Sequence, residues 1–205
     1  PKDIALDANR GKVYWTDADT NKIQRANLNG SVVEDLVTDG LRGLERIALD
    51  VGAGKMYWVN AGSYKIQRAN LNGSTVEDVI TTGLFVPSAI ALDVDSGKIY
   101  WTDLGSDKIQ RANLDGSSAE EVVTGLKDPW QIALDLRVCY ALLVSAAPFK
   151  GGSVVVDSEP NCAGVEAYGE GTSVRLTAVP NDGYIFANWS GGTNGQINPT
   201  TITIT

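Results

Sequence analysis

The chain contains no histidine among its 205 residues. Histidine is the side chain most often used as a general base, a frequent metal ligand, and the group whose charge changes near neutral pH. Its absence argues against histidine-dependent catalysis, against histidine-rich metal sites and against a histidine pH switch.

Cysteine is scarce as well, because the sequence contains only Cys139 and Cys162. Two cysteines fit neither a zinc site nor a disulfide-dense scaffold. A disulfide between them and a pair of buried thiols both remain open.

Long apolar runs are missing, and positive charge is in deficit. No run approaches the roughly 18 apolar residues that indicate a transmembrane helix. The net charge of −8 disfavours nucleic acid and anionic membranes as partners, because both attract Lys and Arg. We therefore expect no nucleic-acid partner and no membrane insertion. Pro1 directly precedes a repeat motif, as in a processed or trimmed chain.

What the chain does contain is a set of short motifs that occurs three times. Tyr14, Tyr57 and Tyr100 lie 43 positions apart in equivalent motifs. Periods of roughly 40–50 residues built from short strands indicate the blades of a β-propeller. In the first copy the motifs are Ile4–Asp7, Lys12–Asp17, Lys22–Leu28 and Asn29–Ser31.

Each copy predicts four antiparallel strands. Residues 12–16 are rich in β-branched and aromatic side chains, and residues 22–28 alternate between two unlike faces. Asn29-Gly30 predicts a type I′ turn before an outer strand at 32–37. Four strands make one blade. We expect blades at about 3–40, 44–83 and 87–125, and a partial fourth at 129–145 because Ile132–Asp135 repeats the first motif.

The repeated residues resemble YWTD repeats, the class B repeats of the low-density lipoprotein receptor. The motif residues are Tyr14, Trp15 and Asp17; Tyr57, Trp58 and Asn60; and Tyr100, Trp101 and Asp103. The resemblance implies that the Tyr and Trp pack between blades and that the Asp ties neighbouring repeats by hydrogen bonds. Val59 and Asn60 are expected to weaken this tie locally without changing the fold.

The resemblance also implies a ring of six blades, of which this chain supplies three and part of a fourth. Unpaired repeat faces are costly. Two copies could pair, the chain could be a fragment of a longer one, or the residues that follow could cap the blades. We expect a homo-oligomer or a fragment.

The composition changes after residue 145. Residues 146–152 are rich in Pro, Gly and small residues and predict a linker. Residues 153–205 predict a small β module with strands near 153–156, 173–179, 184–189 and 200–205. The run from Gly171 to Gly191 resembles the divergent internalin-type B-repeat modules of bacterial surface proteins. The predicted fold is therefore all-β, with YWTD-type β-propeller blades over 1–145 and a C-terminal β module.

No residues point to catalysis, a metal or a cofactor. The aspartate of the Ile-Ala-Leu-Asp motif recurs in every copy, which indicates a role in the blade's own hydrogen bonding. Asp17, Asp19 and Asn21 are spaced like the start of a calcium loop, but Lys22 occupies the position where that loop needs glycine. The repeated Lys and Arg of the third strand are expected to pair with acidic residues of the same blade.

Candidate binding residues are those that vary between copies just before each inner strand: Glu45, Arg46, Ser88, Trp130 and Gln131. In YWTD propellers this junction borders the face used for ligands. Trp130 suits an interface, because large aromatics dominate binding hot spots, and its burial against the linker or the second module is the alternative.

We interpret the chain as a non-catalytic, extracellular or cell-surface protein of bacterial type that binds or adheres to a protein or glycan ligand. One alternative is a self-assembling structural subunit that forms a ring-closing dimer or a filament. Another is a propeller hydrolase or lactonase, for which the sequence offers no metal cage or catalytic carboxylate.

Overall fold

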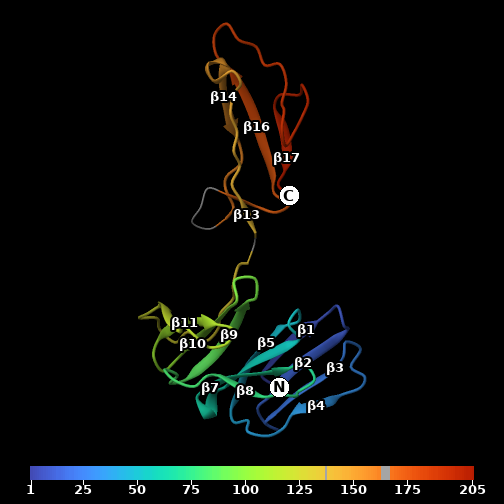
Figure 1. The fold of residues 1–205 in the computed structure, drawn as a ribbon, viewed down its shortest axis with the longest axis vertical. Helices are drawn as coiled ribbons and strands as arrows, with labels where there is room; N and C mark the ends of the chain where they lie inside the picture. Colours follow the sequence, from blue (N-terminus) through green and yellow to red (C-terminus); the bar gives the residue numbers. More distant parts are fainter. Residues whose placement is uncertain (137, 163–166) are drawn as a thin grey trace. The chain divides into compact units, whose positions relative to one another are not determined.

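The computed structural model describes residues 1–136, 138–162 and 167–205. The protein is all-β, as the sequence predicts (Figure 1). The chain divides into two compact units, unit 1 from Pro1 to Leu134 and unit 2 from Asp135 to Thr205.

Unit 1 consists of three blades, each a four-stranded antiparallel sheet whose strands follow one another in chain order. Blade 1 contains β1 (Asp3–Asp7), β2 (Lys12–Asp17), β3 (Lys22–Asn27) and β4 (Glu34–Val37). Blade 2 contains β5 (Leu44–Asp50), β6 (Lys55–Asn60), the 3-10 helix η1 (Ala61–Ser63), β7 (Lys65–Asn70) and β8 (Glu77–Ile80). Blade 3 contains β9 (Pro87–Asp93), β10 (Lys98–Asp103), β11 (Lys108–Asn113) and β12 (Glu120–Val123).

The turn after the third strand differs from the predicted type I′ geometry. Gly30 has φ +80°, but the other left-handed residue is Val32 and not Asn29. The Asn29 side chain accepts a hydrogen bond from the Ser31 backbone N–H at 3.0 Å. An asparagine side chain can shape a turn in this way without adopting a left-handed backbone itself.

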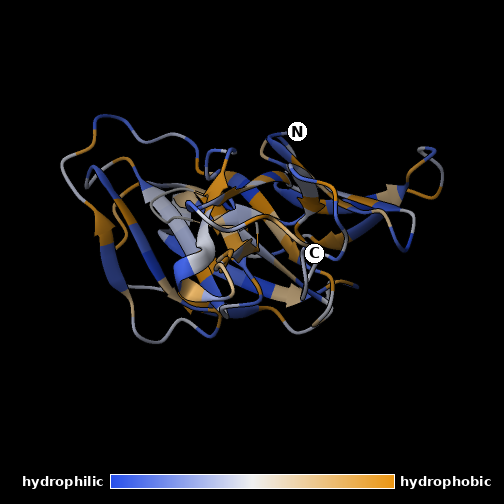
Figure 2. Ribbon diagram, turned by 90° about the horizontal axis from the view of Figure 1, so that it is seen from above, coloured by the Kyte–Doolittle hydropathy of each residue, from blue (hydrophilic) through white to orange (hydrophobic). Residues whose placement is uncertain are grey.

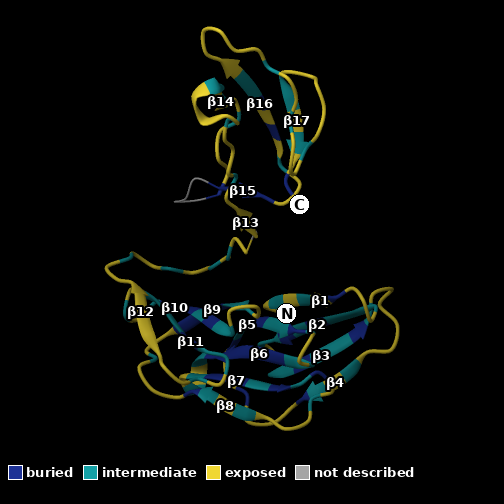
Figure 3. Ribbon diagram, turned by 45° about the horizontal axis from the view of Figure 1, so that its top comes forward, coloured by how far each residue is buried: buried dark blue, intermediate teal, exposed yellow. Residues whose placement is uncertain are grey.

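The core of unit 1 lies between successive blades. Both hydrophobic and hydrophilic residues occur along the strands (Figure 2), and successive side chains point to opposite faces of each sheet. One buried cluster joins blades 1 and 2, and a second joins blades 2 and 3. Trp58 and Trp101 are among the largest fully buried side chains, one in each cluster. The strands of blade 2 are the most buried, whereas β12 is exposed along its length (Figure 3).

Unit 2 contains a two-stranded and a three-stranded sheet. In the first, β13 (Cys139–Tyr140) pairs with β15 (Tyr168–Gly169). In the second, β14 (Gly152–Val156), β16 (Ser173–Pro180) and β17 (Thr200–Thr203) lie in the order β14-β16-β17, after the 3-10 helix η2 (Phe149–Gly151). Its buried cluster consists of Tyr168, Val174, Leu176 and Ile204.

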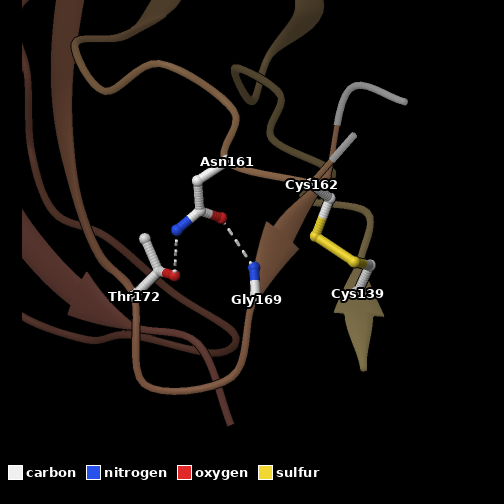
Figure 4. The surroundings of a disulfide bond; sticks show 5 residues. All are labelled: Cys139, Asn161, Cys162, Gly169 and Thr172. Carbon is white, nitrogen blue, oxygen red and sulfur yellow. Dashed lines mark hydrogen bonds between the residues drawn. A yellow bond between two sulfur atoms is a disulfide. The ribbon is translucent and has the colours of Figure 1, made fainter. Parts of the chain in front are cut away.

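A disulfide joins Cys139 to Cys162 in unit 2, so the two cysteines are not free thiols in this structure (Figure 4). Beside it, Asn161 accepts a hydrogen bond from the Gly169 backbone N–H at 2.8 Å and donates one to Thr172 Oγ1 at 3.0 Å. These bonds hold the Cys162 segment against the strand that follows it.

The partial fourth blade expected over 129–145 is not formed as a sheet. All residues of 124–136 are described, and none lies in a strand. Cys139 and Tyr140 pair with β15 of unit 2, and Cys139 is tied there by the disulfide. The division between units consequently lies before the linker expected over 146–152. Leu136 and Val138, which follow the repeated motif, are both exposed, and Arg137 lies outside the described residues.

The strand expected at 184–189 is also wrong. Only Trp189 forms a bridge there, with Gly195, and residues 184–188 lie outside strands. Ile185 is almost fully exposed, so the segment does not bury alternate side chains. A strand needs a partner that accepts its backbone hydrogen bonds, which aromatic composition alone does not supply.

Candidate functional site

One edge of the blades carries all of the predicted binding residues. Because the strands are antiparallel, the start of each first strand lies beside the end of each second strand, as the pairings Asp3 with Thr16 and Pro87 with Asp103 show. The connections 38–43 and 81–86 reach the same edge. We call this edge, with its connecting residues, the rim.

The last residue of the Tyr-Trp strand organises the rim. In blade 3, the buried carboxylate of Asp103 accepts hydrogen bonds from the backbone N–H groups of Phe85 at 2.7 Å and Val86 at 3.0 Å. It also accepts from Gly105 at 3.0 Å and Ser106 at 3.1 Å. Four donors compensate a buried charge and fix the connection that enters blade 3.

Asn60 replaces this aspartate in blade 2, and the structure corrects the expectation that it weakens the tie. Its Oδ1 accepts from the Arg42 backbone N–H at 2.8 Å. Its Nδ2 donates to the Gly40 carbonyl at 2.9 Å and to Gln67 Oε1 at 2.8 Å. The amide thus binds the entering connection as both acceptor and donor, which a carboxylate cannot do.

Asp17, the equivalent in blade 1, is used by its own turn. Its Oδ1 accepts from the backbone N–H groups of Thr20 at 3.1 Å and Asp19 at 3.0 Å. The hydrogen bond from Thr20 lowers the pKa of the Asp17 carboxyl from its usual value. Among the residues that the structure describes, no group of three or more acidic, histidine or cysteine side chains could hold a metal ion.

Glu45 and Arg46 lie on the rim but are engaged between blades 1 and 2. Glu45 Oε1 is 3.1 Å from Lys2 Nζ, and Arg46 Nη1 is 3.5 Å from Asp3 Oδ1. The Glu45 carbonyl accepts from Thr16 Oγ1 at 2.6 Å. These side chains therefore hold neighbouring blades together, and only their outer surfaces face solvent.

Ser88, Trp130 and Gln131 divide into one buried and two exposed residues. Ser88 is buried, and its Oγ donates to the Trp130 carbonyl at 3.2 Å. This bond fixes the Trp130 backbone on the rim, while the Trp130 side chain and Gln131 are exposed. Within unit 1 the Trp130 side chain is 59% exposed.

Sequence reasoning missed the exposed apolar residues of the rim, Phe85, Val86 and Tyr64. Asp103 holds Phe85 and Val86 through their backbone N–H groups, and the side chains of both residues are exposed. The equivalent positions in the preceding connection are Arg42 and Gly43. Variation between copies at these positions is the signal that identifies them, the same signal that selected Trp130.

The basic side chains of the third strands pair within their own blades, which confirms that expectation. The lysine pairs are Lys22 with Asp35, Lys65 with Asp78 and Lys108 with Glu121. The arginine pairs are Arg25 with Glu34, Arg68 with Glu77 and Arg111 with Glu120. Because each cation has an acidic partner, these residues form no basic patch.

The blades and their motif residues place the chain in a known family. The chain belongs to the low-density lipoprotein receptor class B repeat family, whose pattern matches residues 11–51, 54–94 and 97–136. Residues 142–205 match the divergent InlB B-repeat domain. Both resemblances drawn from the sequence are therefore confirmed.

Individual relatives match small parts of the chain. Human low-density lipoprotein receptor-related protein 4 is 51% identical over 39 residues, 19% of this chain and 2% of the relative. The mouse protein of the same name is 49% identical over 39 residues, with the same coverage. The chain thus spans about 2% of the length of these curated relatives.

Solved structures share the arrangement of the blades. A chain in the crystal structure of a nidogen/laminin complex aligns with a TM-score of 0.63 at 29% identity, covering 68% of this chain and 56% of that chain. Virginiamycin B lyase from Staphylococcus aureus aligns with a TM-score of 0.52 at 20% identity, covering 63% of this chain and 43% of the lyase. The lyase likeness concerns the fold alone. Among the described residues, no helix is long and apolar enough to cross a membrane.

Proposed function

We propose that this chain is a non-enzymatic protein-binding scaffold that works outside the cell and binds its partner through the rim. The observation that carries the proposal is the exposed Trp130 side chain on a backbone fixed by Ser88. Phe85 adds a second exposed aromatic on a connection fixed by Asp103. Rigidly held aromatics supply large contact area at low entropic cost, and they are enriched in binding hot spots.

A protein partner is favoured over a glycan by the relatives. The nidogen chain that aligns with this one comes from a complex with laminin, and the other relatives are lipoprotein receptor-related proteins. Apolar rim residues such as Val86 beside Phe85 also suit a protein surface, where interface cores are depleted in charge.

A binding role is favoured over catalysis by the chemistry of the chain. The chain contains no histidine, the side chain most often used as a general base. The rim carboxylate of Asp103 accepts hydrogen bonds from four backbone N–H groups, which is a structural role in fixing the connection.

Extracellular placement is supported by the disulfide between Cys139 and Cys162. Disulfides persist in oxidising compartments and are rare where cytosolic thiols are kept reduced. The InlB B-repeat match of residues 142–205 supports a bacterial cell-surface setting.

The test is a binding screen of residues 1–205 against purified extracellular proteins, laminin included, and against a glycan array. We expect binding to a protein that Trp130→Ala weakens by at least about 30-fold, the effect of removing a hot-spot aromatic. Phe149→Ala is the control, because Phe149 is an exposed aromatic of unit 2 and lies off the rim. If Trp130→Ala leaves binding unchanged, the binding site does not lie on the rim. If the chain binds glycans and no protein, the proposed protein ligand is wrong.

A further inference from the structure

The two inter-blade interfaces of unit 1 are built from the same positions. We call the surface that the earlier blade contributes its trailing face, and the surface that the later blade contributes its leading face. Between blades 1 and 2, Tyr14, Ile23 and Val37 of the trailing face meet Ile47, Trp58 and Leu71 of the leading face. Between blades 2 and 3, the equivalents are Tyr57, Ile66 and Ile80 against Ile90, Trp101 and Leu114.

A hydrogen bond of the same kind crosses both interfaces. Arg25 Nη1 on the trailing face of blade 1 donates to the Leu71 carbonyl of blade 2 at 3.0 Å. Arg68 Nη1 of blade 2 donates to the Leu114 carbonyl of blade 3 at 3.1 Å. Each interface therefore has a charge-assisted bond that fixes the register of the two blades.

Close backbone contact also recurs. A Cβ atom at Gly73 of blade 2 would lie 2.2 Å from the Leu36 carbonyl oxygen of blade 1. One at Gly116 of blade 3 would lie 2.0 Å from the Val79 carbonyl oxygen of blade 2. Glycine is required at both positions, because a side chain would separate the blades. Nothing lies within 4 Å of the equivalent position at Gly30 of blade 1.

The leading face of blade 1 is the first uncovered copy of this interface. Ile4 is 62% exposed, whereas its equivalents Ile47 and Ile90 are 5% and 7% exposed. Trp15 is partly exposed where Trp58 and Trp101 are buried. Apolar residues that are buried in two copies of the same sheet and exposed in the third indicate a contact surface that no other blade of unit 1 covers.

The trailing face of blade 3 is the second uncovered copy. Val123 is 40% exposed, whereas its equivalents Val37 and Ile80 are 5% and 4% exposed. Arg111 Nη1, the equivalent of the two bridging arginines, lies 3.5 Å from the Tyr100 hydroxyl and makes no bond to a further blade.

We propose that the leading face of blade 1 binds the trailing face of blade 3 of a second copy of this chain, so that copies associate head to tail. The partner is specified by the chain itself, because the same two surfaces already bind each other twice within unit 1. In the joint, Val123 of one copy packs against Ile4 and Trp15 of the other. Arg111 donates to the carbonyl of Leu28, the equivalent of Leu71 and Leu114.

The innermost strand at this joint corresponds to two segments with the same sequence, residues 132–135 of one copy and β1 of the other. Thr16 Oγ1 of β2 donates to the Glu45 carbonyl, and Ser88 Oγ of β9 donates to the corresponding carbonyl of Trp130. Residues 130–135 therefore begin near the place where the next blade would begin. Ile132–Asp135 repeats the Ile-Ala-Leu-Asp sequence of β1 in the second copy. In the joint, β1 of the second copy takes this position.

A head-to-tail interface is heterologous, because its two sides are different surfaces. Such interfaces close into a ring where the rotation between copies allows it and otherwise extend into a filament. A ring gains a second interface at no further cost in translational entropy, since the second contact is intramolecular.

The experiment is light scattering after size exclusion on residues 1–205, from low micromolar to millimolar concentration. We expect the mass to rise above that of one chain, and Ile4→Glu to weaken association by at least about 30-fold by placing a charge in the joint. Val33→Glu is the matched control. Val33 is 59% exposed, and its equivalent Val76 remains 46% exposed although blade 2 is flanked on both sides.

Val123→Glu on the opposite face provides a second variant, and it is expected to weaken association as Ile4→Glu does. Circular dichroism of each variant at low concentration should match the wild type, because both side chains are exposed in one copy. A wild-type chain that stays monomeric throughout overturns the proposal. The proposal is also overturned if Ile4→Glu and Val123→Glu both leave association intact, or if Val33→Glu weakens association as much as they do.

Discussion

Equivalent tryptophans in blades 1 and 2 should differ sharply in their contribution to stability. Trp58 is fully buried between blades 1 and 2, among residues of both, whereas Trp15 occupies the same strand position on an uncovered face. Side chain, strand and motif are the same, and the two positions differ in the neighbouring blade and in the indole N–H. Trp15 Nε1 donates to Gln24 Oε1 at 3.1 Å, whereas Trp58 Nε1 has no partner.

The magnitudes follow from burial. Removing a fully buried large aromatic side chain costs about 3–5 kcal/mol, because transfer free energy and a residual cavity add. We therefore expect Trp58→Ala to lower the free energy of unfolding of unit 1 by about that amount. Trp15→Ala should cost about 1–2 kcal/mol, since one side of the ring has no partner to lose and solvent can fill the space.

The assay is urea unfolding at low protein concentration, followed by tryptophan fluorescence. Four of the five tryptophans lie in unit 1, so fluorescence reports mainly on that unit. Equal costs for the two substitutions would contradict the burial argument. At high concentration the cost of Trp15→Ala should rise toward that of Trp58→Ala, because a second copy then covers Trp15.

Three further outcomes are expected. Trp58 Nε1 is buried without a hydrogen-bond partner, whereas Trp101 Nε1 donates to Gln110 at 3.2 Å, so Trp101→Phe should cost about 1 kcal/mol more than Trp58→Phe in urea unfolding. Hydrogen bonds from Lys22 and Lys65 lower the pKa of the Asp35 and Asp78 carboxyls below the usual 3.8. Their contribution is therefore complete above pH 3.8 and is lost as the pH falls through the lower folded-state pKa values, so urea midpoints should be flat near neutrality and decline below about pH 4. Reduction of the disulfide, which closes a 23-residue separation, should destabilise unit 2 by about 3 kcal/mol and increase hydrogen exchange in β14 and β16 without changing exchange in β5 to β7.

The blades could be predicted from the sequence because their determinants are local. The strand at Lys65–Asn70 alternates between two faces, and glycine turns with positive φ follow at the same offset in each copy. Periodicity and turn chemistry do not depend on the rest of the molecule, so three repetitions made the pattern unambiguous.

The roles of individual rim residues could not be predicted in the same way. Glu45 and Arg46 vary between copies as a ligand-binding pair would, but they face Lys2 and Asp3 across a blade junction. Asn60 preserves its tie because Gly40 presents a carbonyl oxygen to its amide nitrogen. Both outcomes depend on which group a neighbouring segment places opposite the side chain, and one strand's sequence does not contain that information.

The missing strand at 184–189 has a similar cause. Its aromatic residues are typical of strands, but Trp189 finds only an isolated partner at Gly195. A strand forms where two segments pair through backbone hydrogen bonds, whereas amino-acid composition describes a single segment.

The central claim is that a single interface, repeated, joins blades both within a chain and between chains. The most direct test mixes Ile4→Glu, whose trailing face is intact, with Val123→Glu, whose leading face is intact. At concentrations where the wild type just associates, each variant alone should remain monomeric. The equimolar mixture should form a heterodimer that grows no further, because it contains only one pair of unmodified faces. At those concentrations, a mixture that stays monomeric or a variant that assembles alone would contradict the claim.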